Sequence, residues 1–211
     1  MSAEKRVRLY ELAKKYNVPI LEDNPYGDLR FAGQDIPTIK SLDTDGLVIY
    51  AGTFSKVLSP GLRVGYAIAP KELMPKLIVC KQVSDVHTCL LSQMIAFEFM
   101  TKYDFDGHLE KNRGIYRKKA QLMMDNMDQK LLDHLSYNKI EGGLFIWCTL
   151  PESVDMLALC KKGIEKGVAV VPGNAFAMDD TLVNHNIRLN FSTPTDQQIV
   201  DGIEILANLF K

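Results

Sequence analysis

The sequence predicts an α/β protein built from two parts. Short apolar runs alternate with turn-rich loops in the first seventy positions, and helical segments follow them. Such runs are typical of strands in a sheet that is buried between helices. A charged segment at residues 108–135 then leads to further strands and helices. We therefore expect one domain over residues 1–104 and a second over residues 105–211.

A helix is expected at the start of the chain, because Ser2 is a favourable N-cap and Asn17 commonly ends helices. Its apolar side chains recur at the spacing of one helical face, and they are Leu9, Leu12, Ala13 and Tyr16. Three apolar runs then predict strands at residues 18–22, 46–52 and 64–70. The loops between them are rich in residues that form turns.

Helices and strands also alternate in the remainder of the chain. Helices are expected over residues 71–84 and 88–103, with Pro75 in a first turn, where a missing N–H is tolerated. Gly107 is expected to act as a hinge before a long charged helix. Beyond it, we expect strands at residues 143–150, 168–173 and 186–192 and helices at residues 154–166 and 194–210.

Composition argues against several classes of function. The formal net charge is −1, from 25 Lys and Arg against 26 Asp and Glu, so no surface for nucleic acid or anionic membranes is expected. The longest apolar runs are too short to cross a bilayer, and the first residues lack the apolar core of a signal peptide. The four cysteines and four histidines show no metal-site spacing. We expect a cytoplasmic protein with no metal site.

The candidate site consists of seven residues at the ends of predicted strands or, for the last one, within a strand: Asp23, Tyr26, Thr53, Ser55, Lys56, Arg63 and Arg188. Ligands bind at strand ends in open α/β sheets. Taken one at a time, these residues have simpler explanations. Asp23 precedes Asn-Pro and could only shape a turn. Lys56 could face solvent, and Arg188 could form a structural ion pair.

Taken together, the residues match the chemical needs of pyridoxal 5'-phosphate (PLP). Lys56 can supply the amine that forms a Schiff base with the cofactor's aldehyde. The phosphate needs hydroxyl groups and a cation, which Thr53, Ser55 and Arg63 offer from one loop. These four positions therefore predict a cofactor anchor within the segment GTFSKVLSPGLRVGY.

Three further positions complete this hypothesis. The carboxylate of Asp23 would keep the ring nitrogen of PLP protonated, because a negative charge favours the cationic form. Tyr26 could donate a hydrogen bond to the ring's phenolic oxygen. Arg188 could bind the carboxylate of an amino-acid substrate through two parallel hydrogen bonds.

Five segments carry these residues in a recognisable order. They read EDNPYGDLRF, GTFSKVLSPGLRVGY, GGLFIWCTLP, GVAVVPGNAF and IRLNFS. In order and spacing they resemble the motifs of class I/II (fold type I) PLP-dependent aminotransferases, particularly the subgroup that acts on 2-aminoadipate, aromatic or branched-chain amino acids. The resemblance runs from the first helix to the last residue. It implies a partial fold: the remainder of a large, mostly parallel-sheet domain and a small C-terminal α+β domain.

The resemblance also implies an activity, the transamination of an amino acid with a 2-oxo acid. Lys56 would be the Schiff-base lysine and would move the substrate's proton. Ser55 and Arg63 would hold the phosphate, with Thr53 where the family often has Ser. Arg188 would bind the substrate's α-carboxylate.

For the cofactor ring, the resemblance assigns Asp23 to the pyridine nitrogen and Tyr26 to the phenolic oxygen. It implies a homodimer. Family members carry a long N-terminal half with a glycine-containing phosphate loop, a stacking aromatic residue and an asparagine. We therefore expect this chain to be the C-terminal portion of such an enzyme.

Two other interpretations remain open. The sensory domain of GntR/MocR-type transcription regulators also resembles an aminotransferase, although EDNPYGDLRF is closer to the enzymes. Alternatively, the chain is a catalytically inert fragment that only folds or dimerises.

Overall fold

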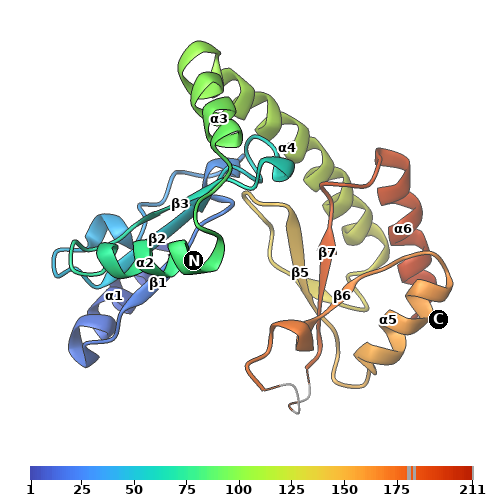
Figure 1. Cartoon of the computed structure of the whole chain (residues 1–211). Coiled ribbons are helices and arrows are strands. Elements are labelled where there is room, and N and C mark those ends of the chain that lie inside the picture. Colours follow the sequence, from blue (N-terminus) through green and yellow to red (C-terminus); the bar gives the residue numbers. More distant parts are fainter. Residues whose placement is uncertain (180–181, 183, 211) are drawn as a thin grey trace. The chain divides into compact units, whose positions relative to one another are not determined.

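Two separate sheets organise the structure, one in each half of the chain (Figure 1). The computed structural model describes residues 1–179, 182 and 184–210. Two units are distinguished by their internal packing, Met1–Asn112 and Arg113–Lys211. This is a mixed α/β architecture, as the sequence predicts. The division falls inside a helix, whereas the expected domain boundary at residues 104/105 precedes that helix and stays a prediction.

The first helix, α1 (Ala3–Tyr16), has the caps that the sequence predicts. The hydroxyl of Ser2 accepts a hydrogen bond from the backbone N–H of Lys5 at 3.4 Å. Asn17 ends the helix in the left-handed conformation, with φ 51°. Such local signals need no tertiary context, and this explains why both ends of α1 were predictable.

The sheet of the first unit has three strands in the order β1-β2-β3. They are β1 (Ile20–Asp23), β2 (Val48–Thr53) and β3 (Gly65–Ile68). β1 and β2 are parallel, with Asp23 opposite Ala51, whereas β2 and β3 are antiparallel, with Thr53 opposite Gly65. The C-terminal ends of β1 and β2 and the N-terminal end of β3 therefore lie at one edge of the sheet, here named the ligand edge.

The two faces of this sheet differ in packing. Tyr10 of α1, Ile39 and Val48 form a buried cluster on one face. Leu21 and Asp23 point to the other face, because side chains alternate along a strand, and both are exposed. All four residues of β3 are exposed as well. The first unit therefore buries only one face of its sheet.

A buried carboxylate fixes the connection between β1 and β2 to the start of β2. Asp43, whose side chain is 1% exposed, accepts hydrogen bonds from the backbone N–H groups of Leu47 (2.9 Å) and Val48 (3.0 Å) and from Nζ of Lys40 (2.9 Å). Burial acts to raise the pKa of Asp43, but these hydrogen bonds outweigh it and hold the pKa well below its ordinary value of 3.8. Asp43 is therefore ionised in the folded unit at neutral pH.

Three helices follow β3. They are α2 (Met74–Asp85), α3 (Leu90–Lys102) and α4 (Phe105–Lys130). Pro75 lies in the first turn of α2, as predicted. The expected hinge at Gly107 is wrong, because this residue lies in the first turn of α4. Its backbone N–H donates to the carboxylate of Asp104 at 2.8 Å, which caps the helix rather than breaking it.

The second unit contains a four-stranded antiparallel sheet in the order β4-β5-β7-β6. Its strands and helices are β4 (Ser136–Tyr137), β5 (Phe145–Thr149), α5 (Met156–Glu165), β6 (Val171–Pro172), β7 (Asn186–Asn190) and α6 (Asp196–Asn208). β4 has no counterpart among the predicted strands. β6 is shorter than predicted, because the N–H of Val168 donates to the carbonyl of Gly163 at 2.8 Å and so belongs to the end of α5.

One face of this second sheet is fully packed. Ile146 of β5 and Ile187 of β7 are 0% exposed, and they lie with Met127 of α4 and Leu206 of α6 among the most buried side chains of the unit. The alternate residues of β5 and β7 point to the other face and are partly or fully exposed. The second unit therefore has a continuous core on one side of its sheet and an open face on the other.

The four cysteines divide between the units. Cys80 and Cys89, in the first unit, are exposed, whereas Cys148 and Cys160, in the second, are buried. Burial raises the pKa of Cys148 to about 12. In the described part of the chain, no helix is long and apolar enough to span a membrane, and no group of His, Cys, Asp and Glu could hold a metal ion.

Candidate active site

The ligand edge brings together three of the predicted site residues. Asp23 is the last residue of β1 and Thr53 the last of β2, and Arg63 lies two residues before β3. The register of the strands sets all three at the same edge of the sheet. Asp23 and Thr53 also point to the same face of the sheet. Asp23 is aligned with Ala51 of β2, and Thr53 lies two residues after Ala51, so the alternation of side chains brings it to the same face.

The loop that carries Lys56 is ordered by hydrogen bonds at its base. The N–H of Phe54 donates to the carbonyl of Val64 at 3.0 Å, which joins the two ends of the loop. The hydroxyl of Thr53 accepts from the N–H of Ser55 at 3.1 Å and donates to the Ser55 hydroxyl at 3.0 Å. The two hydroxyl groups that are predicted to bind the phosphate, those of Thr53 and Ser55, therefore lie beside each other.

Lys56 itself is half-buried, and its side chain makes no hydrogen bond or ion pair with the residues that the structure describes. Arg63 is exposed and adopts the left-handed conformation, with φ 55°, which is uncommon for a residue with a side chain. Its Nη1 donates to the carbonyl of Pro60 at 3.2 Å. Tyr26 is half-buried and directly precedes the short 3₁₀ helix at Gly27–Leu29.

A close packing contact explains the glycine in β2. A Cβ atom at Gly52 would collide with the ring of Tyr66, which covers this position from β3. The ring of Tyr66 also lies 5.8 Å from that of Phe54, measured between centroids. The aromatic side chains thus support the strand end from which the lysine loop begins.

His108 is a residue of this site that the sequence did not reveal. Its Nε2 lies 2.8 Å from the carbonyl oxygen of Val57, the residue after Lys56, and 3.0 Å from Nδ2 of Asn112. The imidazole packs edge-on against Phe99, with centroids 5.2 Å apart. His108 therefore ties the start of α4 to the lysine loop. Only the four-residue spacing of His108 and Asn112 hints at this in the sequence.

Arg188 lies in the second unit, on the open face of its sheet, in the inner strand β7. It is opposite Trp147 of β5 and Val171 of β6. Its guanidinium carbon lies 3.9 Å from the ring centroid of Phe145 and 4.7 Å from that of Phe176. The Nε atom is buried and has no hydrogen-bond partner among the described residues. The ion pair considered for this arginine from the sequence is not observed within the described chain.

The seven predicted residues thus fall into two groups. Six belong to the ligand edge and its loops in the first unit, and Arg188 belongs to the second unit. Sequence reasoning missed the two phenylalanines beside Arg188. Phe145 lies in the quoted segment GGLFIWCTLP, and Phe176 lies in GVAVVPGNAF, but an aromatic residue in an apolar segment usually indicates core packing.

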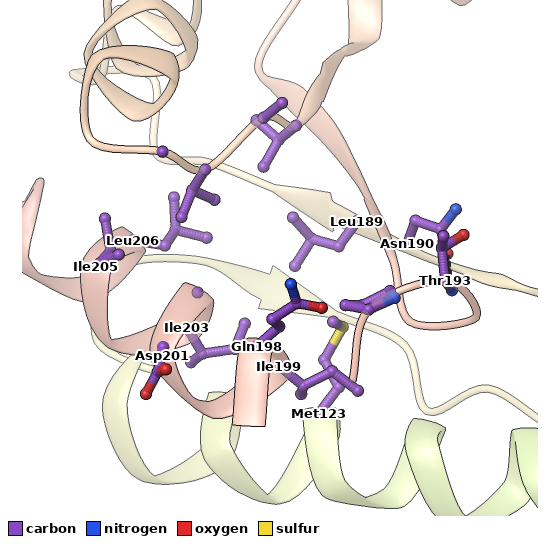
Figure 2. A pocket seen from close by; sticks show the side chains of 16 residues that line it. Met123, Leu189, Asn190, Thr193, Gln198, Ile199, Asp201, Ile203, Ile205 and Leu206 are labelled. Carbon is purple, nitrogen blue, oxygen red and sulfur yellow. Dashed lines mark hydrogen bonds between the residues drawn. The ribbon is translucent and has the colours of Figure 1, made fainter. Parts of the chain in front are cut away.

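A cavity of about 480 Å³ lies elsewhere, within the second unit (Figure 2). The labelled side chains of Met123, Leu189 and Ile199 point toward it from α4, β7 and α6. Leu189 belongs to the packed face of β7, opposite to Arg188, and none of the seven predicted site residues lines this cavity. It is therefore a separate, mostly apolar hollow and not part of the candidate site.

Similar proteins were found over the full length of the chain. It is 40% identical over 211 residues to aromatic-amino-acid aminotransferase 1 of Thermococcus litoralis, covering 100% of this chain and 50% of that protein. It is 35% identical to the 2-aminoadipate transaminase of Thermus thermophilus, covering 98% of this chain and 52% of that protein. The chain thus spans about half the length of the curated relatives it matches.

One match bears on the regulator hypothesis. The chain is 30% identical to the uncharacterised helix-turn-helix transcriptional regulator YdfD of Bacillus subtilis, covering 100% of this chain and 43% of that protein. The same half-length sequence therefore resembles both enzymes and a regulator, at higher identity to the enzymes.

Solved structures agree in fold. The kynurenine aminotransferase of Pyrococcus horikoshii, crystallised in complex with PMP, matches with a TM-score of 0.95 and 36% identity. The match covers 99% of this chain and 52% of that chain. The model of the family described as aminotransferase class I and II matches residues 1–206. With this match over nearly its whole length, the chain belongs to the class I and II aminotransferase family.

Proposed function

We propose that this chain carries the cofactor-binding lysine of a PLP-dependent aminotransferase and takes part in the transamination of an amino acid with a 2-oxo acid. The observation that carries the proposal is the ligand edge, since Asp23, Thr53 and Arg63 all lie at this edge of the sheet and the loop of Lys56 begins there. Family membership supports the reaction class.

The groups at the ligand edge fit PLP chemically. Adjacent hydroxyls of Thr53 and Ser55 and the cation of Arg63 suit a phosphate, which accepts hydrogen bonds on several oxygens. The amine of Lys56 has no partner within the described chain, so it is available to the cofactor's aldehyde. Asp23 is exposed at the strand end and can face a protonated ring nitrogen.

Each residue has a distinct role in this proposal. When bound, PLP supplies an electron sink that stabilises negative charge on the substrate's α-carbon. Lys56 would remove the proton from that carbon as a general base. Asp23 would keep the ring nitrogen protonated, and Tyr26 would donate a hydrogen bond to the phenolic oxygen.

Arg188 would bind the α-carboxylate of the substrate. Its buried Nε lacks a partner, and the whole guanidinium forms no hydrogen bond with described residues, so its donors remain for a ligand. Arginine suits this role because its planar fork matches a carboxylate with two parallel hydrogen bonds.

The role of Lys56 can be tested by attaching PLP covalently to the lysine at which it binds. Borohydride reduction in the presence of PLP should fix the cofactor on one lysine, and peptide mapping by mass spectrometry should find it on Lys56. The unaltered chain should also show the absorption band that PLP gains when a lysine holds it. Lys56→Ala should lose both signals, whereas Lys76→Ala, an exposed lysine of the same unit, should keep them.

Labelling spread evenly over many lysines, or an unchanged spectrum in Lys56→Ala, would disprove the role of Lys56. We expect the chain on its own to retain PLP weakly and to show little turnover, because it spans about half the length of its relatives. Turnover similar to that of a full-length relative would contradict this inert-fragment expectation. We also propose a homodimer for the active enzyme, which light scattering of the PLP-bound protein can test.

A second candidate function is effector sensing in a transcription regulator. The match to YdfD favours it, although the identity to enzymes is higher. The DNA sequence upstream of Met1 separates the two. An encoded helix-turn-helix would favour the regulator, and an encoded glycine-containing phosphate loop alone would favour the enzyme.

A further inference from the structure

The open face of the second unit's sheet carries an unusual group of side chains around Arg188. Along β5 and β7, buried Ile146 and Ile187 face the core, so Phe145, Trp147 and Arg188 must face the other way. Arg188 and Trp147 are directly opposite each other in the strand register. The open face therefore presents a cation among aromatic rings.

Two of these rings contact the guanidinium directly. Phe145 comes from the neighbouring strand and Phe176 from the 3₁₀ helix after β6, so two separate segments bring rings to within 5 Å of its carbon atom. Trp147 packs edge-on against Phe176, with centroids 5.4 Å apart. Contacts between a cation and aromatic faces are attractive, and they strengthen when water is excluded.

The burial of individual atoms shows which nitrogen donors of Arg188 remain accessible to a ligand beside the aromatic rings. Among the nitrogen atoms of Arg188, only Nε is both shielded from water and without a partner. The terminal nitrogens, Nη1 and Nη2, also lack hydrogen bonds to described residues, yet they are not shielded. The guanidinium thus turns its terminal edge, rather than its Nε side, toward the open face.

We propose that Phe145 and Phe176 are positioning residues for substrate binding: their rings fix the guanidinium of Arg188 so that its two terminal nitrogens meet a carboxylate end-on. Trp147 supports this arrangement by holding the ring of Phe176. This inference rests on the proposed function, because it takes the carboxylate to be that of an amino-acid or 2-oxo-acid substrate. It adds that the affinity for the carboxylate depends on two phenylalanines that form no hydrogen bond with it.

The physical reason is the loss of freedom on binding. A free arginine side chain has several rotatable bonds, and ordering it for a ligand costs free energy that a pre-positioned guanidinium does not lose. Flat rings also restrict the plane of the guanidinium, which a bidentate contact requires. Lysine, which has no planar group to lie against the rings, should therefore replace Arg188 poorly.

The test measures carboxylate binding without turnover. The probes are 3-methylbutanoate and its uncharged isostere 3-methylbutanamide, titrated into the full chain by calorimetry at constant ionic strength. Trp147 is the single tryptophan of the sequence, so its fluorescence reports whether the probe reaches the open face. The unaltered chain should prefer the carboxylate, and Arg188→Ala should abolish that preference.

Phe145→Leu and Phe176→Leu should each weaken carboxylate binding roughly fivefold to tenfold, the size of a partly shielded cation–aromatic contact. Phe176→Tyr keeps an aromatic face and should stay within about twofold of the unaltered chain. Phe210→Leu is the matched control, because Phe210 stacks on His134 in the same unit and does not contact Arg188. It should leave the affinity unchanged.

A spectroscopic signal separates positioning from general damage. In the unaltered chain, the Nε–H proton of Arg188 should exchange slowly with water in ¹H–¹⁵N spectra, because Nε is buried. Phe176→Leu should speed this exchange, and Phe176→Tyr should restore it. Thermal unfolding of each variant checks that the unit remains folded.

The outcomes distinguish the two proposals. If Arg188→Ala abolishes the preference for the carboxylate while both leucine variants bind as tightly as the unaltered chain, the positioning role is wrong and the carboxylate role of Arg188 stands. If Arg188→Ala binds the carboxylate normally, or if the unaltered chain shows no preference, the substrate-binding role of Arg188 fails and the positioning role fails with it.

Discussion

The two units differ in how much of their apolar surface they bury. They are similar in length, yet within the described residues the second has about twice as many buried apolar side chains as the first. The first has more than twice as many exposed large apolar side chains. In the first unit, β3 is exposed throughout, α2 has no fully buried residue, and Ala96 is the one fully buried residue of α3.

Because of this difference, the larger apolar core and most of the proposed site residues belong to different units. The second unit has the continuous core, whereas six of the seven proposed site residues belong to the first. Apolar burial is the main source of folding free energy, so the unit with the proposed cofactor-binding lysine should be the less stable one. Bound PLP would add stability to it, because a ligand that binds only the folded form shifts the equilibrium.

The largest expected effect comes from truncating the same side chain in each sheet. Ile146→Ala removes a side chain that is 0% exposed and should cost the second unit about 4 kcal/mol of unfolding free energy. Ile68→Ala, at a position 51% exposed in β3, should cost the first unit no more than about 0.5 kcal/mol.

Urea unfolding measures both variants, with Trp147 fluorescence for the second unit and circular dichroism for the whole chain. Similar losses for Ile146→Ala and Ile68→Ala would show that β3 is covered in solution and that the contrast between the units is wrong.

Hydrogen exchange should show the next largest contrast. Backbone amides in the ladder of β5 and β7 should exchange at least about a hundredfold more slowly than those of β3, because opening the second sheet exposes a continuous core. Mass spectrometry of peptic peptides measures both in a single experiment. Equal protection of the two sheets would mean that the units open together.

A smaller effect concerns the buried carboxylate of the first unit. Asp43→Asn should lower the unfolding free energy by about 2 kcal/mol, because charged hydrogen bonds to Lys40 and to two backbone N–H groups become neutral or are lost. The second unit should not respond, and Asp35→Asn, at an exposed position of the same unit, is the control.

The pH dependence of this effect has a definite sign. Folding lowers the pKa of Asp43 below 3.8, so its contribution is complete above about pH 4 and is lost as the pH falls through the folded-state pKa. The first unit should therefore lose stability on acidification below about pH 4. Asp43→Asn should remove that part of the pH dependence, and an unchanged acid transition would contradict the assignment.

The sequence predictions were most accurate where the deciding interactions are between residues close together in the sequence. Ser2, Asn17 and Pro75 act within one helical turn, so the ends of α1 and the start of α2 were predictable. Gly107 was misinterpreted because the capping contact from Asp104 counts for more than the low helix propensity of glycine. β4 has two residues and therefore no periodicity that a sequence could reveal.

The candidate site shows the same limit. The placement of Asp23, Thr53 and Arg63 at strand ends was predictable, because each one lies at or near the end of a strand with a strong apolar pattern. The contact of His108 with Val57 spans 51 positions, and Phe176 reaches Arg188 from another segment, so neither contact leaves a local signal. Such contacts depend on how strands and helices pack, which a single sequence does not specify.

The two units differ in the exposure of their cysteines, so a thiol reagent can distinguish them. Hydrogen bonds from the backbone and hydroxyl of Ser92 lower the pKa of the exposed Cys89 thiol, whereas burial raises that of Cys148. A maleimide dye added to the folded chain therefore labels the first unit alone, beginning at Cys89. The same asymmetry means that oxidation in air should reach the thiols of the first unit and leave the buried thiols of the second unreacted.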